Sequence, residues 1–219
     1  MNKLNSLRKI GQNKNVVQLI LFLFLCSCAT KKSVEVDNVV KYKLKTVAVT
    51  YDAKKLSYIG LQKYCIGGFR MEKPNEKGCE NCKSKNEFYI FWSENDKSFV
   101  QKFDNCSEFH KLEISDFNPI EFLKSNANEL KSESIKRYQI DEETYSTVSH
   151  SCFRNYVFND GQNKYEKKFD IYDLTGENIN LNFNYNNGTR LIKLDTQLNG
   201  IIAELESQNK FKRNKKSSR

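Results

Sequence analysis

The stretch of sequence that decides the fold runs from Phe88 to Asp104 and reads FYIFWSENDKSFVQKFD. An aromatic run, Phe88–Trp92, is followed by the turn-forming residues 94–97 and then by Phe99 and Phe103, which fall on one side of an extended chain. Two such runs around a short polar turn predict a β-hairpin. Because the chain holds a single Trp, we expect these rings to form the core of a sheet and not a platform for an aromatic ligand.

Upstream of this hairpin, apolar residues alternate with lysines from Val40 to Lys45, and the period of two continues through Val47 and Val49, which predicts a half-buried strand. From Asp52 to Tyr64 the spacing of Leu56 and Ile59 is closer to that of a helix. The pair at 67–68, two glycines, then breaks the chain.

Downstream of the hairpin, Asn118 to Glu121 carry a strong helix-start signal, with Asn as N-cap, Pro at the first helical position and Glu three residues after the cap. The apolar stripe of this helix is predicted to comprise Ile120, Leu123, Ala127 and Leu130.

The C-terminal third predicts further hairpins and one last helix. Strands are expected at 152–158 and 165–174, joined by a loop at 159–161. After a turn at 175–176, a strand at 179–185 and a strand at 189–193 are expected to form a hairpin around a type I′ turn at Asn187-Gly188. A helix is expected from about Asp195 to Gln208. Antiparallel hairpins with flanking helices indicate the α+β class: an antiparallel sheet built from hairpins, with two or three flanking helices.

Charge is the next constraint on function. The 219 residues include 36 Lys+Arg and 27 Asp+Glu, for a formal charge of +9. Four basic residues lie before Cys28 and six lie after Ser207, and neither of these two terminal segments contains an acidic residue. The segment between them therefore has 26 basic and 27 acidic residues. This balance removes the case for a nucleic-acid partner.

The N-terminus has the layout of a signal peptide. Lys3, Arg8, Lys9 and Lys14 precede an apolar run from Val16 to Leu25 that only Gln18 interrupts. The run is too short for a permanent membrane span, which needs about 20 apolar residues.

The end of this leader, Leu25-Cys26-Ser27-Cys28, resembles the lipobox of bacterial lipoproteins. The resemblance implies that Cys28 is acylated and tethers the protein to the lipid bilayer; Cys26 is the rival acceptor and fits less well because the large Leu25 precedes it. The resemblance also implies an envelope location, with Ala29 after the cysteine favouring the outer membrane. The expected organisation is a leader at 1–27, a lipidated tether at 28–38, one α+β domain at 39–207 and a basic disordered tail at 208–219.

Five cysteines stay outside the leader and the lipidation site: Cys65, Cys79, Cys82, Cys106 and Cys152. An oxidising envelope favours disulfides, so we expect at least one bridge, but two bridges and one free thiol can be drawn in fifteen ways. Cys79 and Cys82 have the C-x-x-C spacing of a thiol-redox motif, yet the segment around them reads as a loop.

Two chemical alternatives remain at these residues. Cys79, Cys82, Cys106 and His110 have spacings that a zinc ion could use, with His150 and Cys152 as spares, although thiols in an oxidising compartment usually form disulfides first. A redox role for the Cys79–Cys82 pair is the other alternative.

Catalytic motifs are otherwise missing from the sequence. It has two histidines, and Ser149-His150-Ser151 is not expected to form a nucleophile and base pair, because neighbours on an extended chain point to opposite faces. The sequence therefore favours a non-catalytic envelope lipoprotein that has no cofactor and is cross-linked by disulfides. Its expected partner is an envelope protein or a cell-wall component.

Overall fold

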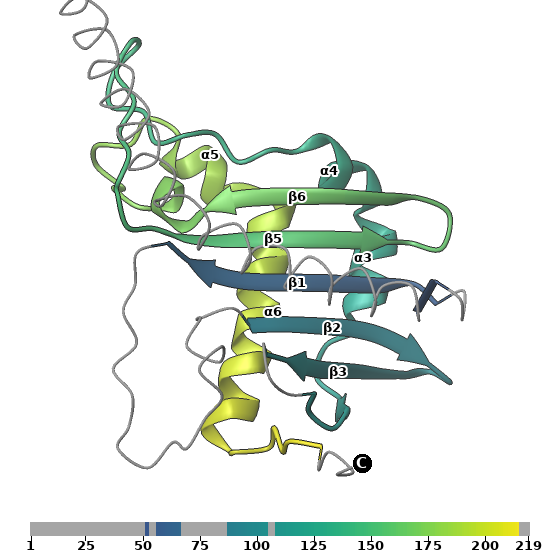
Figure 1. Cartoon of the computed structure of the whole chain (residues 1–219). Coiled ribbons are helices and arrows are strands. Elements are labelled where there is room, and N and C mark those ends of the chain that lie inside the picture. Colours follow the sequence, from purple (N-terminus) through teal and green to yellow (C-terminus); the bar gives the residue numbers. More distant parts are fainter. Residues whose placement is uncertain (1–50, 53–55, 67–86, 105–107, 215–219) are drawn as a thin grey trace, which may run out of the picture. The chain divides into compact units, whose positions relative to one another are not determined.

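The computed structural model describes residues 51–52, 56–66, 87–104 and 108–214, all within one compact unit, Leu44–Arg219. Its centre is a six-stranded antiparallel sheet with the strand order β4-β3-β2-β1-β5-β6 (Figure 1). The strands are β1 (Tyr58–Cys65), β2 (Glu87–Glu94), β3 (Lys97–Phe103), β4 (Leu112–Ile114), β5 (Cys152–Asn159) and β6 (Lys164–Asp170). The helices are α3 (Pro119–Ser125), α4 (Ala127–Ser132), the 3-10 turn η2 (Ile171–Leu174), α5 (Phe183–Gly188) and α6 (Arg190–Ser207). The predicted α+β class is confirmed.

The hairpin predicted from Phe88 to Asp104 is confirmed as β2 and β3. Glu94 pairs with Lys97, and the two residues between them, Asn95 and Asp96, have φ angles of 53° and 61°. A two-residue turn with both central residues in the left-handed region matches the right-handed twist of the strands.

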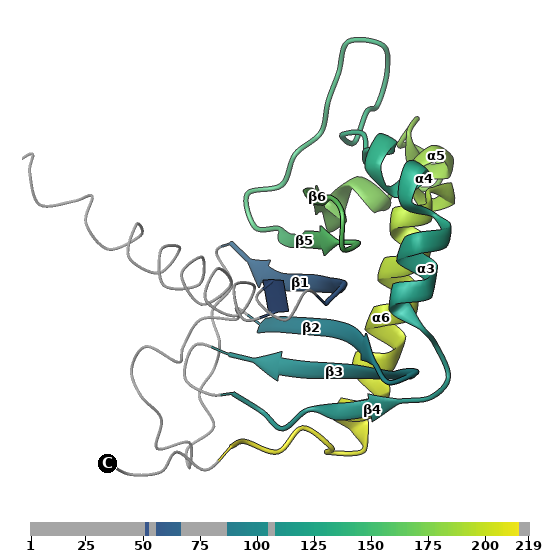
Figure 2. The ribbon, with the colours of Figure 1, turned by 90° about the vertical axis from the view of Figure 1, so that its right-hand side faces the viewer.

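Helices cover one face of this sheet. Figure 2 shows α3, α4 and α6 side by side on that face, and their apolar side chains pack with those of the central strands into the main core. The Asn118 side chain accepts hydrogen bonds from the backbone of Ile120 and Glu121, which confirms the predicted N-cap. The opposite face carries an aromatic cluster that includes Trp92 and Phe103, so the interpretation of these rings as core is confirmed as well.

The helical interpretation of 52–64 is wrong, because most of this segment belongs to the strand β1. That strand lies between β2 and β5, and both of its faces are covered: Ile59 and Leu61 belong to the main core, while Tyr58 belongs to the aromatic cluster. A strand buried on both sides has no alternation of polar and apolar residues, so the period of two was missing from the sequence.

The last predicted hairpin is also wrong. The segment 183–188 is the helix α5, and α6 begins at Arg190, where the Thr189 side chain accepts a hydrogen bond from Ile192 N. The segment 171–174, predicted as the end of a strand, is the turn η2. The strand at 152–158, the loop at 159–161 and the final helix are confirmed, the helix starting five residues earlier than expected.

The C-terminal tail is ordered further than predicted. Backbone hydrogen bonds join His110 N to Lys212 O (3.0 Å) and Asn214 N to Glu108 O (2.8 Å), and the Phe211 ring packs edge-on against Tyr89. These contacts contradict a disordered tail from 208 onward, at least through 214. The leader, the tether, the predicted strand at 40–49 and the glycine pair at 67–68 lie outside the described residues. Within the part described, no helix has the length and apolar character required to span a bilayer.

Candidate interaction surface

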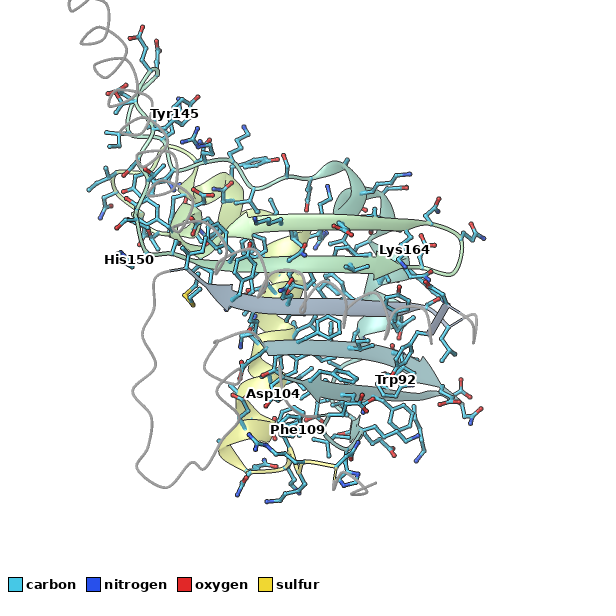
Figure 3. All side chains as sticks on the ribbon, viewed as in Figure 1. Trp92, Asp104, Phe109, Tyr145, His150 and Lys164 are labelled. Atoms are coloured by element: carbon cyan, nitrogen blue, oxygen red, sulfur yellow. A yellow bond between two sulfur atoms is a disulfide. The ribbon has the colours of Figure 1, made fainter. Side chains whose placement is uncertain are left out.

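Large apolar side chains are exposed mostly in two segments, 140–148 and 179–185. The exposed members of these segments are Ile140, Tyr145, Val148, Ile179, Leu181 and Tyr185. Leu181 is the most exposed of them, at 62%. Figure 3 places Tyr145 at the end of the unit away from Trp92 and Lys164. We call Ile140, Tyr145, Ile179, Leu181 and Tyr185 the apolar surface.

One part of this surface is a short two-stranded projection, Tyr138–Ser146, which we call the finger. Gln139 pairs with Tyr145 in an isolated antiparallel bridge, Ile140 N donates to Thr144 O (2.9 Å) and Ser146 N donates to Tyr138 O (3.0 Å). In Figure 2 the segment between α4 and β5, which contains the finger, extends away from the sheet.

The tip of the finger is closed by Asp141. Its Oδ1 accepts hydrogen bonds from Glu143 N (3.0 Å) and Thr144 N (2.8 Å), and these bonds lower the pKa of the Asp141 carboxyl below its ordinary value. The side chains of Glu142 and Glu143 at the same tip are exposed.

The base of the finger is fixed to the rest of the fold. The Tyr138 ring stacks on Tyr172 with 4.7 Å between centroids, and Tyr138 N donates to Asp173 Oδ1 (2.8 Å). Gly176 has a φ of +79° and lies so close to the Tyr138 ring that a Cβ would clash with it. The finger is therefore presented by a packed aromatic base.

Buried asparagines hold the second segment against the first. The Asn186 side chain is fully buried; its Oδ1 accepts from Lys136 N (2.9 Å), and its Nδ2 donates to Lys136 O (2.8 Å) and Asp173 O (2.9 Å). Asn180 Oδ1 accepts from Gln139 N (3.2 Å). Leu181 N donates to Gln139 O (2.8 Å), which places the most exposed leucine beside the centre of the finger.

This arrangement reverses the prediction for 179–185. A strand in which Leu181 and Phe183 alternate with asparagines would bury the apolar side chains and expose the asparagines, whereas Asn180 is buried and Leu181 is exposed. The signal that could have revealed it is the density of asparagines from 178 to 187, because Asn side chains readily bond to nearby backbone in place of regular structure.

Two cations lie over the exposed tyrosines. Lys136 Nζ is 4.3 Å from the Tyr185 ring centroid, and the Arg137 guanidinium carbon is 5.1 Å from that of Tyr145. Within the described ranges, neither cation forms an ion pair with a carboxylate. The apolar surface is thus bordered by two positive charges that a partner could neutralise.

Of the predicted cysteine sites, the structure brings together one pair. Cys65 and Cys152 lie opposite each other on β1 and β5 and form a disulfide, which confirms the expectation of at least one bridge. Cys28, Cys79, Cys82 and Cys106 lie outside the described residues, so the lipidation, redox and zinc hypotheses at these positions stay predictions. Among the residues the structure describes, no three His, Cys, Asp or Glu side chains are grouped as metal ligands.

The two histidines lie in different surroundings. His110 contributes its backbone N–H to the contact with the C-terminal segment. His150 Nδ1 lies 2.8 Å from Ser149 Oγ, contrary to the expectation that these neighbours point apart; the backbone bends here and is not an extended strand. Both side chains are exposed, so this contact has no enclosure that would exclude water from a reaction.

A layer of charged residues fixes α6 to the helix-covered face of the sheet. Lys102 Nζ donates to Glu87 Oε1 (2.8 Å) and Glu206 Oε1 (2.7 Å), and Tyr89 OH donates to the same Glu206 oxygen (2.9 Å). Burial alone would lower the pKa of Lys102, but its hydrogen bonds to the two glutamates outweigh burial and raise it. This arrangement joins β2, β3 and the end of α6.

A second part of the layer lies nearer the middle of α6. Tyr156 OH donates to Asp195 Oδ1 (2.6 Å), and Arg154 Nε lies 3.5 Å from the same oxygen. Burial raises the pKa of the Asp195 carboxyl in spite of these partners. Because each carboxylate already has donors from the protein, the layer is best explained as the attachment of α6.

Comparisons of the chain with protein-family models, with curated proteins and with solved structures found no match.

Proposed function

We propose that this protein is an envelope lipoprotein, anchored by acylated Cys28, whose folded unit is a non-catalytic binding domain. The observation that carries the binding role is the apolar surface, because Leu181 and Tyr145 are more than half exposed on a rigidly held support. Clustered exposed apolar side chains are a feature of interaction sites. A surface that is ordered before binding loses less conformational entropy when the partner arrives.

The residue types of the surface support this role. Tyr and Arg are enriched at protein interfaces because they combine a large contact area with a polar or charged end. The surface contains two tyrosines, each with a cation over its ring, around three aliphatic side chains. This composition favours an envelope protein over a cell-wall polymer as the partner.

The anchor is tested by replacing Cys28 with Ala in the full-length chain. We expect the variant to leave the membrane fraction for the soluble envelope fraction or to remain unprocessed, because the lipobox resemblance makes Cys28 the acyl acceptor. The measurement is fractionation with metabolic labelling by a fatty acid. Cys26→Ala is the matched control and should keep both label and membrane association; a labelled Cys28→Ala chain would show that the acceptor was wrongly assigned.

The binding role is tested by photo-cross-linking in the intact envelope. A photoreactive residue in place of Leu181 should give a discrete adduct of higher mass, because this side chain is the most exposed on the apolar surface. The same residue in place of Lys124, an exposed position on α3, is the control and should give none. Equal labelling at the two positions, or no adduct from Leu181, would count against an interaction site here.

A further inference from the structure

The charges along the finger have an order that makes the surface complementary to itself. Lys136 and Arg137 lie at its base, the Gln139–Tyr145 pair and Ile140 lie in the middle, and Glu142 and Glu143 lie at the tip. From Arg137 to Ile140 an extended chain advances by about 10 Å before it turns at the tip. The charge therefore changes from positive to negative along one short projection with an apolar middle.

The charged side chains at both ends are available for a partner. Over the described ranges, no ion pair involves the two cations, Lys136 and Arg137, or the two glutamates, Glu142 and Glu143. All four side chains are exposed. The Asp141 carboxylate is different, since it closes the tip by accepting two backbone hydrogen bonds.

We propose that the apolar surface pairs with a second copy of this chain, across a two-fold axis that passes beside the Gln139–Tyr145 pair. Two fingers placed antiparallel bring the glutamates of each copy to the Lys136 and Arg137 of the other. An isologous interface requires the same patch to carry both halves of each contact, and this order of charges meets that requirement.

The apolar side chains lie where such an axis needs them. Leu181 is held beside Gln139 by a 2.8 Å backbone hydrogen bond, and Tyr145 pairs with Gln139 across the finger. Pairing would remove Leu181 and Tyr145 from water at the centre of the contact, while the ion pairs form its rim. Acylation confines the copies to one membrane, which raises their effective concentration. This inference rests on the proposed function, because it names the partner of the same surface.

The test uses two charge-reversed forms of the full-length chain. Lys136→Glu with Arg137→Glu makes both ends of the finger acidic, and Glu142→Lys with Glu143→Lys makes both ends basic. Each form faces like charges when it pairs with itself, whereas a mixed pair restores opposite charges at both ends. Two differently tagged copies are expressed together, and the recovery of one tag with the other is measured in detergent extract.

We expect each reversed form to reduce its own co-recovery at least about tenfold, and the mixed pair to return to the wild-type level within about twofold. Lys124→Glu, a reversal on exposed α3, is the control and should change nothing. Restoration by mixing also shows that both forms fold, since a misfolded copy would not be rescued by its counterpart.

Two results would overturn the pairing. One is the failure of wild-type copies to co-purify; the other is a mixed pair that recovers no better than the reversed forms alone. If the Leu181 adduct then contains a different protein, the binding role stands and only its partner changes. If Leu181 gives no adduct at all, the proposed function fails with it.

Discussion

Replacing Cys65 and Cys152 together with serine is expected to lower the free energy of unfolding by about 4 kcal/mol. The two cysteines are 87 residues apart, so the bridge closes a long loop and strongly restricts the unfolded chain. It also ties together β1 and β5, neighbouring strands that are separated in sequence by β2, β3, β4, α3 and α4. The measurement is the urea midpoint and slope of the oxidised variant against the oxidised wild type.

Both cysteines are replaced at once, because a single replacement would leave a thiol free to exchange with the other cysteines of the chain. The control is the wild type under reducing conditions, which should fall to about the stability of the double serine variant. A loss below about 1 kcal/mol would mean that the bridge does not restrict the unfolded chain as the loop-entropy argument requires.

The elements that were predicted correctly are those with a complete local signal. The β2–β3 hairpin has aromatic runs on both sides of Asn95 and Asp96, and α3 has its cap, proline and glutamate within four residues. The strand β1 has no such signal, because neighbours on both faces bury it and its sequence contains none of those neighbours. The pairing of Cys65 with Cys152 follows from the β1–β5 register, which long-range topology determines.

The interaction surface was missed for a related reason. Alternating Leu181 and Phe183 with asparagines is a correct strand pattern when the asparagines face water. Here Asn180 and Asn186 instead satisfy the buried backbone of 136–139, a segment more than 40 residues away. A polar side chain that is buried in order to bond distant backbone cannot be distinguished, in the sequence, from one that is solvated.

Asn186→Ala is the substitution that tests this explanation, with an expected loss of about 3 kcal/mol in the free energy of unfolding. The truncation removes one acceptor and two donor contacts, so Lys136 N and Lys136 O lose their partner in a part-buried place, whereas Asp173 O keeps the hydrogen bond from Asn180 Nδ2 (2.9 Å). An unsatisfied buried polar group costs about 1–3 kcal/mol, and limited entry of water should reduce the sum for the two Lys136 groups to about 3 kcal/mol.

The same substitution should also weaken cross-linking from Leu181. The hydrogen bonds between the Asn186 side chain and the Lys136 backbone, which we call the Lys136 clamp, help to hold the finger against 179–185. Asn184→Ala is the matched control: it changes the same residue type in the same helix, at an exposed position, and should stay within about 0.5 kcal/mol of the wild type. Urea unfolding measures stability, and hydrogen exchange of the Lys136 and Gln139 amides measures the clamp directly. If Asn186→Ala unfolds like Asn184→Ala and the Lys136 amide keeps its protection, the buried asparagine does not organise the surface, and the packing of Tyr138 on Tyr172 must hold the finger by itself.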